Sequence, residues 1–506
     1  MMLRKKQGNG KIFGSFREMH GSALDKIPFY GYNINNMNYL MGGLIMEDYV
    51  PAIVLIGIGG YGVLYVDEIF RDMERELCIL VGVVDPAAKA SPRYEEIVSR
   101  GIPVYDTPEA FFAENTADLC CIAAPIQFHT PYTLTAMKHG CHVLCEKPLS
   151  GDWRDGLLLD AIAEKEYKFV MSGYQWSHSD AILGLKKDIL CGMYGAPKHL
   201  KTRILWPRSK SYFNRGSGWA GKRYAADGTP IFDSVANNAA AHYLHNMLFV
   251  LGERMDLAAT PVSVDAELLR TNPIENFDTC VIRMKLEGGA DALFIATHST
   301  AETVNPVFTY EFERGTVTFT DGDGKGIVAV MNDGTVKEYG NPFADQMNKV
   351  RYAIAAVDAA PEYRALPCTV KTAIPHARCI DAIRDVPIAD IPESMIEIVM
   401  MGAEKNDPLR AVKGLKDALF ACYERGCMLS ELNDADSAAL REILKPAFGL
   451  PLPDGSMDCA AYDAFYADAV FPAAACDDTS AADAALEELL KPMPKRCGGR
   501  KKKIKT

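Results

Sequence analysis

The chain has 506 residues, of which 48 % are hydrophobic, so it is long enough to bury two or three domain cores. Its formal net charge of −12 argues against nucleic acid or an anionic membrane as the main partner. The 14 cysteines are scattered and no C-x-x-C motif has a partner motif, so we expect a reducing cytoplasm and no metal site.

Residues 1–45 are rich in Asn and Gly and have no sustained apolar period. They are either a disordered arm or a segment that is not translated, because Gly42-Gly43 can be encoded by a ribosome-binding sequence just ahead of Met46. In both cases a chain that begins at Met46 is expected to fold and to melt like the full chain. The basic N-terminal residues lack a following apolar segment, so no signal peptide is expected.

An apolar run over 52–56 breaks into the motif G-x-G-x-x-G and continues as a helix-like segment to about residue 76. A strand that ends in such a turn leaves backbone N–H groups free at a helix N-terminus, where a pyrophosphate can bind. Gly57 permits the tight turn, Gly59 lets the backbone approach the phosphates, and Gly62 lets helix and strand pack closely. The residues expected to contact a dinucleotide here are Gly57, Ile58, Gly59, Gly60, Tyr61 and Gly62.

A second apolar strand, over 78–84, ends at Asp85, which lies 23 positions after Gly62. That spacing suits a carboxylate that binds the hydroxyls of the adenosine ribose. Because such a carboxylate repels a 2′-phosphate, NAD is expected in preference to NADP. Strands and helices then alternate as far as residue 150, which predicts an α/β domain with a doubly wound parallel sheet of the Rossmann type over 46–150.

A different pattern follows, with strands expected at 198–206, 262–269, 279–285, 290–297, 309–313, 316–320 and 327–331. Gly/Asp turns join them, which is typical of a mostly antiparallel sheet in an α+β domain over 151–430. Helical patterns at 343–358, 369–384 and 410–425 are expected to pack on this sheet or to return to the first domain. Residues 431–506 are Ala-rich and acidic, then basic, and are expected to form an appendage with at most short helices.

A further motif, Glu146-Lys147-Pro148, follows the apolar strand over 142–145. Pro148 biases Lys147 toward an extended conformation at the carboxyl end of a strand, the edge at which doubly wound sheets bind ligands. A lysine held there away from water has a lowered pKa and can serve as a base. The alternative is a surface lysine in a strand-to-helix turn.

Taken together, three features resemble the Gfo/Idh/MocA oxidoreductase family over about residues 51–430: the glycine motif, Ala124-Pro125 with His129 four residues on, and Glu146-Lys147-Pro148. The resemblance implies NAD(P)-linked chemistry on sugars or polyols, with Lys147 as the catalytic acid/base near the nicotinamide. It also implies a C-terminal open-faced sheet used for substrate and oligomer contacts. The residues expected beside the cofactor on this basis are Ala124, Pro125, His129, Glu146 and Lys147.

A helix expected over 236–251 places Asn238, His242 and His245 on one face. In the family an Asp, and a His four residues later, line the sugar site from this helix. His242 matches the histidine, whereas Asn238 departs from the aspartate and cannot ionise. Two alternatives are a solvated polar face and a metal site at His242 and His245.

Aromatic and guanidinium groups suit sugar rings and carboxylates, so Trp206 and Arg208 are expected to contact substrate, together with Gln175 and His245. A surface loop without a ligand is the alternative for Trp206 and Arg208. Lys147, His242 and Asn238 are the expected catalytic residues. The expected protein is a cytoplasmic homo-oligomer that transfers hydride between NAD and a secondary alcohol of a sugar, cyclitol or polyol. A ligand-binding regulator and an NAD-requiring glycosidase are the alternatives.

Overall fold

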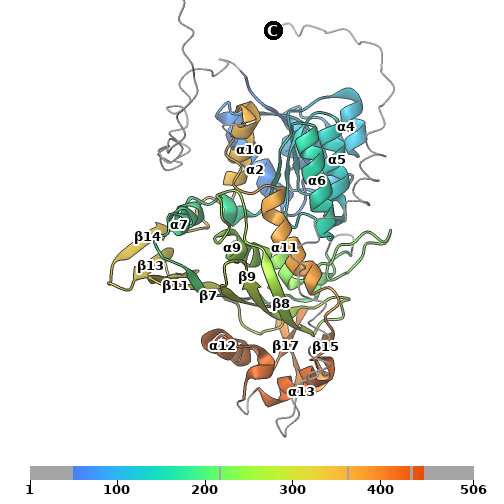
Figure 1. Cartoon of the computed structure of the whole chain (residues 1–506). Coiled ribbons are helices and arrows are strands. Elements are labelled where there is room, and N and C mark those ends of the chain that lie inside the picture. The colour runs from blue at the N-terminus through green and yellow to red at the C-terminus, as the bar shows by residue number, and fades with distance from the viewer. Residues whose placement is uncertain (1–48, 216–217, 362–363, 434–436, 449–506) are drawn as a thin grey trace, which may run out of the picture. The chain divides into compact units, whose positions relative to one another are not determined.

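The computed structural model describes residues 49–215, 218–361, 364–433 and 437–448 (Figure 1). The arm expected over 1–45, the start at Met46 and the tail beyond residue 448 lie outside these residues. All described residues fall within one structural unit that begins at Asp48. None of their helices is long and apolar enough to cross a lipid bilayer.

The first sheet has six strands, all paired in parallel, in the order β3-β2-β1-β4-β5-β6. Its strands are short, and every residue of β4 and β5 is buried because helices cover both faces (Figure 1). The predicted doubly wound parallel sheet is therefore confirmed. The strands are β1 (Ala52–Ile56), β2 (Ile79–Val84), β3 (Val104–Tyr105), β4 (Leu119–Ile122), β5 (His142–Cys145) and β6 (Val170–Ser172), and the helices include α2 (Gly62–Glu74), α4 (Pro108–Glu114), α5 (His129–Lys138) and α6 (Trp153–Lys165).

The order of these strands reverses between β1 and β4, since β2 and β3 lie on one side of β1 and β4 to β6 on the other. The carboxyl ends of β1, β4 and β5 consequently meet at one edge of the sheet. Gly57, Ala123 and Glu146 are the residues that follow these three strands. Ligands of doubly wound sheets bind at this reversal point, so the topology itself brings the predicted cofactor residues together.

The second sheet has nine strands in the order β14-β13-β12-β11-β7-β10-β9-β8-β15. Six of its eight pairings are antiparallel; β7–β10 and β8–β15 are parallel, which confirms the expected mostly antiparallel sheet. All seven predicted strands are present, and the sheet also contains β14 and β15. Strands β16 and β17 form a separate two-stranded ribbon. The strands are β7 (Pro197–Leu205), β8 (Pro261–Arg270), β9 (Thr279–Leu286), β10 (Asp291–Thr297), β11 (Val304–Phe312), β12 (Gly315–Thr320), β13 (Ile327–Met331), β14 (Val336–Gly340), β15 (Ile388–Asp390), β16 (Ile396–Met401) and β17 (Asp407–Val412).

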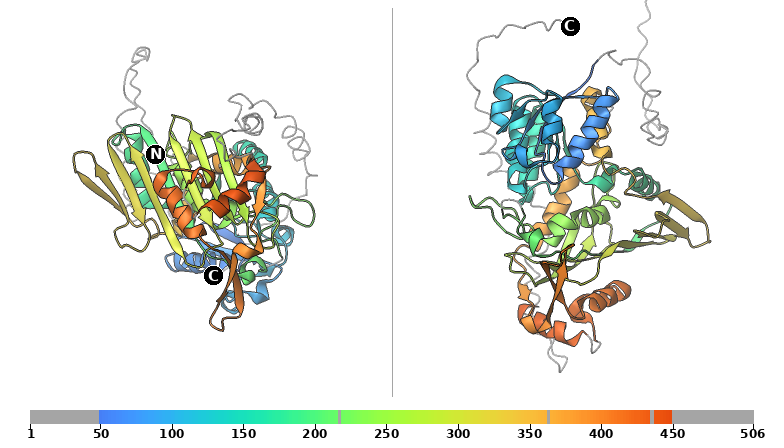
Figure 2. Two further views of the ribbon diagram at one scale, coloured as in Figure 1. Left: turned by 90° about the horizontal axis from the view of Figure 1, so that it is seen from below. Right: turned by 180° about the vertical axis from the view of Figure 1, so that it is seen from behind.

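Later helices connect the layers. Helix α10 (Asn348–Asp358) packs against α2, and α11 (Val370–Ala382) packs against α6, so both return to the first sheet. Figures 1 and 2 show α12 (Leu415–Arg425) and α13 (Ala438–Phe448) on the face of the second sheet that points away from the first. The division expected at residue 150 remains a prediction, although the first sheet itself continues to β6.

Candidate active site

The glycine turn between β1 and α2 is packed closely on its inner side. A Cβ atom at Gly57, whose φ is +88°, would lie 2.5 Å from the carbonyl oxygen of Ala123, and one at Gly62 would collide with the carbonyl oxygen of Gly57. Only glycine fits such positions.

The outer side of the same turn is open. A Cβ atom at Gly59 or Gly60 would meet nothing within 4 Å. Within the described part of the chain, the amides of Gly59, Gly60 and Tyr61 donate to no other group. An open surface lined by free amides at a helix N-terminus fits the pyrophosphate of a dinucleotide.

Asp85 lies beside this turn, at the end of β2. Its carboxylate accepts hydrogen bonds from the amide of Ile58 at 3.0 Å and from the amide of Ala87 at 2.8 Å. The two bonds hold the carboxylate beside the glycine turn. Its contact with a ribose remains a prediction.

Lys147 reaches across to the second half of the chain. Its Nζ donates to the carbonyl oxygen of Asn238 at 3.0 Å and to Oδ1 of the same residue at 3.1 Å. Burial lowers the pKa of Lys147 to about 8, while the charge of Glu146 opposes the shift. The lysine predicted as a base is therefore bonded to the asparagine predicted beside it.

Asp233, which the sequence analysis did not select, supplies a carboxylate behind Asn238. The amide nitrogen of Asn238 donates to Asp233 Oδ1 at 2.7 Å. Asp233 is buried, and burial raises the pKa of its carboxyl group. The only local signal for it is an acid placed between the apolar pair Ile231-Phe232 and the start of the helix.

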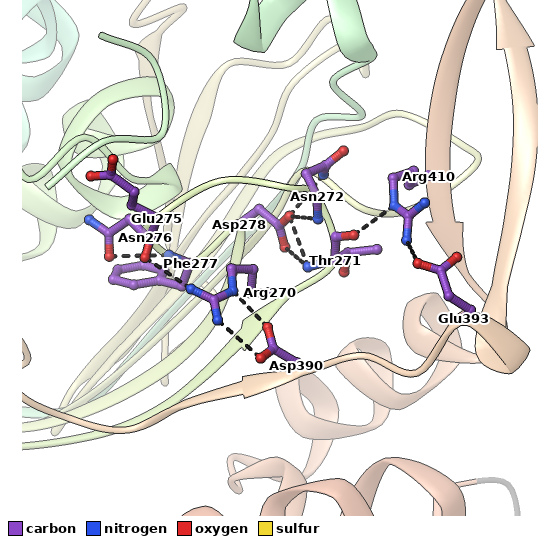
Figure 3. Close-up of polar contacts among 10 residues, drawn as sticks. All are labelled: Arg270, Thr271, Asn272, Glu275, Asn276, Phe277, Asp278, Asp390, Glu393 and Arg410. Carbon is purple, nitrogen blue, oxygen red and sulfur yellow. Dashed lines mark hydrogen bonds and ion pairs between the residues drawn. The ribbon is translucent and has the colours of Figure 1, made fainter.

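The loop between β8 and β9 contains a cluster of polar contacts around Asp278 (Figure 3). The buried carboxylate of Asp278 accepts bonds from the main-chain and side-chain nitrogens of Asn272, at 2.7 and 2.8 Å. The amide of Glu275 donates to the carbonyl oxygen of Gly221, whose own amide donates to Asp233 at 2.5 Å. The polar cluster around Asp278 therefore holds Asp233 through one intermediate loop.

The helix that carries Asn238 is not continuous as expected. Residues Val235–Ala239 form a π-helical turn with a bond from the amide of Ala240 to the carbonyl oxygen of Val235, and α9 (Ala241–Phe249) follows. A π-turn inserts an extra residue, so the 100° spacing used to align Asn238 with His242 and His245 does not hold there. Such turns are frequent at functional sites.

His242 and His245 are buried, so the alternative of a solvated polar face is wrong for them. The Nδ1 atom of His242 is buried without a hydrogen-bond partner among the described residues, and burial holds its pKa well below the usual value. His245 stacks on Tyr174 with ring centroids 3.9 Å apart, and its Nε2 lies 3.0 Å from Ser177 Oγ. No group of three or more His, Cys, Asp or Glu suited to a metal ion occurs in the described ranges.

A buried ion pair joins Glu146 to Lys349, which lies on α10 and was also not selected from the sequence. Lys349 is fully buried. Its Nζ also donates to the hydroxyl of Tyr61 at 3.2 Å and to the carbonyl oxygen of Gly173 at 3.3 Å. Tyr65 donates to the same Glu146 carboxylate at 2.7 Å.

Gln175 and His129 lie at the cofactor edge of the first sheet. Tyr61 donates through its hydroxyl to Gln175 Oε1 at 3.2 Å, so Gln175 adjoins the glycine turn. The two ring nitrogens of His129 lie 2.8 Å from the carbonyl oxygen of Ala124 and 2.7 Å from that of Pro148. His129 thus links the loops after β4 and β5; its contact with a cofactor, like those of Ala124 and Pro125, remains a prediction.

Trp206 and Arg208 lie in the segment that follows β7. Their amides donate to the carbonyl oxygens of Thr297 and His298, at 2.9 and 3.0 Å, which continues the pairing of β7 with β10 beyond the sheet. The Arg208 guanidinium lies 4.9 Å from the ring centroid of Tyr212. Their contact with substrate remains a prediction.

The sequence around the glycine turn and Lys147 matches a model of a known protein family. The model described as "Oxidoreductase family, NAD-binding Rossmann fold" matches residues 52–174, which contain the glycine turn, Asp85 and Lys147. Over these residues the chain matches the Gfo/Idh/MocA oxidoreductase family. The resemblance seen in the three motifs is therefore confirmed, and the matched residues include the strands of the first sheet.

Curated relatives match part of this chain. Inositol 2-dehydrogenase of Corynebacterium glutamicum is 30 % identical over 112 residues, which make up 22 % of this chain and 33 % of that protein. D-glucoside 3-dehydrogenase of Escherichia coli is 42 % identical over 45 residues, 9 % of this chain and 13 % of that protein. The chain therefore spans a third or less of the length of these two relatives.

Solved structures share the fold over about two thirds of this chain. The WlbA dehydrogenase from Bordetella pertussis, in complex with NADH and UDP-GlcNAcA, has a TM-score of 0.53 and 19 % identity, covering 67 % of this chain and 96 % of that one. The aldose–aldose oxidoreductase from Caulobacter crescentus, complexed with glycerol, has a TM-score of 0.54 and 17 % identity, covering 66 % and 97 %.

Proposed function

We propose that this protein is an NAD(P)-dependent oxidoreductase that acts on a secondary alcohol of a sugar, cyclitol or related polyol. The observation that carries the proposal is the amine of Lys147, which lies at the cofactor edge of the first sheet and is bonded to Asn238 of the second layer. Dehydrogenases of inositol and of a glucoside among its relatives support the substrate class.

The proposed reaction assigns each group one task. A bound nicotinamide supplies a hydride acceptor or donor at its C4. The glycine turn and Asp85 hold the dinucleotide, and Lys147, when uncharged, takes up the hydroxyl proton as the substrate carbon becomes a carbonyl. His242, which burial keeps neutral, orients that hydroxyl or relays its proton.

The test is the absorbance of reduced nicotinamide, followed with a panel of sugars and cyclitols in the presence of NAD or NADP. Formation of the reduced band with one class of polyol supports the proposal. Binding of ligand without reduction indicates a regulator instead, and release of a sugar without net reduction indicates a glycosidase.

The choice of NAD over NADP is part of the proposal and rests on Asp85. Like charge at the ribose costs a few kcal/mol, on the order of a hundredfold in affinity. We expect Asp85→Ser to narrow the difference between the dissociation constants of NAD and NADP, measured by fluorescence titration. Equal affinities in the unmodified protein would contradict the assignment, and the exposed Lys89 is then the first residue to test.

The pairing of Asn238 with Asp233 predicts opposite effects for two substitutions. Asn238→Asp places an anion against Lys147 and raises its pKa by about 1–3 units. Turnover at pH 7 is therefore expected to fall about tenfold or more, with the rising limb of the pH profile moved to higher pH. Asp233→Asn removes a nearby anion and is expected to move that limb to lower pH. If the two variants moved the rising limb of the pH profile in the same direction, the result would contradict the assignment of Lys147 as the titrating base.

A homo-oligomer through the second sheet remains a prediction, as does the cytoplasmic location. Helix α12 packs on β7 and β10, and Arg203 of β7 lies 3.7 Å from the ring centroid of Phe420. The central strands are therefore covered on that face. We expect a sheet-mediated interface to lie toward β13 and β14, where Val330 and Val336 are exposed, and sedimentation velocity measures the resulting assembly.

A further inference from the structure

Two arginines share one aromatic ring near the candidate active site. The guanidinium of Arg215 lies 3.5 Å from the ring centroid of Tyr212, and that of Arg208 lies 4.9 Å from the same centroid. Two tryptophans flank the pair, with Arg215 4.8 Å from the ring of Trp219 and Arg208 5.6 Å from the ring of Trp206.

Neither guanidinium has a carboxylate within ion-pair distance among the described residues. Four other arginines of the second layer do: Arg203, Arg270, Arg283 and Arg410. The Nε atom of Arg208 is buried without a hydrogen-bond partner in the described chain. Arg208 donates to the carbonyl oxygen of Pro207, and Arg215 donates to the carbonyl oxygen of Tyr212 and also bonds to the side chain of Tyr212. Two neighbouring cations repel each other, so the arrangement leaves room for an anion to stabilise it.

The cluster is held in place before any ligand binds. The ring nitrogen Nδ1 of His298 lies 2.8 Å from the carbonyl oxygen of Trp206. The carboxylate of Asp407, at the start of β17, accepts bonds from the hydroxyls of Ser209 and Ser211, both at 2.5 Å, and from the amide of Ser211 at 3.0 Å. The β16–β17 ribbon therefore anchors the turn that carries Arg208 and Tyr212.

The cluster also lies within electrostatic reach of the reacting groups. The charge of Arg215 lowers the pKa of Asp233 and that of Lys147, and the charge of Asp233 acts on Tyr212. A ligand whose anion binds the two arginines can therefore extend toward Lys147.

We propose that Arg208 and Arg215 bind an anionic group of the substrate, a carboxylate or a phosphate, so that the alcohol oxidised at Lys147 belongs to an acidic sugar. Guanidinium forks bind both groups through paired hydrogen bonds, and the flanking aromatic rings suit the faces of a sugar. The proposal rests on the proposed function and narrows its substrate class.

The test compares neutral sugars with their acids in the presence of NAD. Calorimetric dissociation constants and rates of nicotinamide reduction are measured for glucose, galactose and mannose, for their uronates and for their 6-phosphates. We expect at least one acid to bind tenfold or more tightly than its neutral parent, and the uronate and phosphate arms identify which anion is preferred.

Variants assign the effect to the two arginines. Arg208→Gln and Arg215→Gln are each expected to weaken binding of the acid on the order of tenfold and to weaken binding of the neutral parent by a smaller factor. Arg215→Lys keeps the charge and is expected to recover part of the loss. Lys210→Gln removes a charge from an exposed side chain of the same turn and is the matched control, with an expected change of less than twofold. Circular dichroism melting checks that each variant is folded.

The two proposals fail in different ways. Tighter or equal binding of neutral sugars, no binding of any acid, or acid binding unaffected by both glutamine variants would overturn the anion site. Reduction of nicotinamide with neutral sugars alone would overturn the anion site and would leave the proposed oxidoreductase activity supported. Binding of an acid that depends on both arginines, without any reduction, would uphold the anion site and overturn the proposed oxidation.

Discussion

Replacing Lys147 by alanine is expected to lower turnover by a factor on the order of 10²–10⁴, because the substitution removes the base that takes the hydroxyl proton. Binding of the dinucleotide is expected to persist, since the glycine turn and Asp85 are untouched. Steady-state rates and a fluorescence titration with NAD separate the two effects. Lys147→Arg is expected to be equally inactive, because arginine keeps the charge but does not deprotonate.

The pH dependence follows from the same group. Burial lowers the pKa of Lys147 to about 8, and a base must be uncharged to accept a proton. The rate of alcohol oxidation is therefore expected to rise with pH and to level off above about pH 8. Lys138→Ala, which removes a lysine from the exposed end of α5, is the control and is expected to change neither rate nor profile.

His242 is expected to act with Lys147. His242→Ala is expected to lose a comparable factor in turnover, and the double variant little more, because members of one relay are not additive. Near-normal turnover after Lys147→Ala would remove the dehydrogenase mechanism and favour a ligand-binding regulator.

Lys349→Met is expected to destabilise the protein by about 3–5 kcal/mol, since it leaves the buried carboxylate of Glu146 without its charge partner. The loss is measured as a change in the free energy of unfolding by urea. Adding Glu146→Gln to the variant removes the uncompensated charge and is expected to recover much of the stability.

An exposed ion pair supplies the control for this effect. Lys371 on α11 pairs with Asp160 on α6 at 3.3 Å, and its side chain is more than half exposed. Lys371→Met is therefore expected to cost no more than about 1 kcal/mol. Equal losses in the free energy of unfolding for the Lys349 and Lys371 variants would show that burial does not increase the contribution of the Glu146–Lys349 pair to stability.

The helix over 235–249 shows where periodicity is insufficient. Spacing along the chain correctly indicated a helix with two histidines on it, but it indicated neither the π-turn at its start nor the burial of His242 and His245. Burial is decided by what packs on the polar stripe, and here Tyr174, from the end of the first sheet, covers His245.

The second sheet was likewise predictable in its strands but not in its pairing. Alternating residues between Gly/Asp turns located seven strands within a few residues. The parallel pairing of β7 with β10, and the addition of β15 beside β8, join segments about a hundred residues apart. Strand β16 escaped prediction because the ribbon it forms is exposed, with Ile398 and Met400 in solvent, so no alternation of buried and exposed residues marks it.

By itself the sequence determined the features whose physical requirements are local. The backbone of a single turn requires glycine at 57 and 62. The position of Asp85 follows from the end of the next strand, and the extended conformation of Lys147 follows from the proline after it. Tertiary structure alone decided the partners of these groups: Asn238 and Asp233 for Lys147, and Lys349 for Glu146. The residues of each pair lie 91 and 203 positions apart, and the charge that a buried group needs can be supplied from any element that the fold brings beside it.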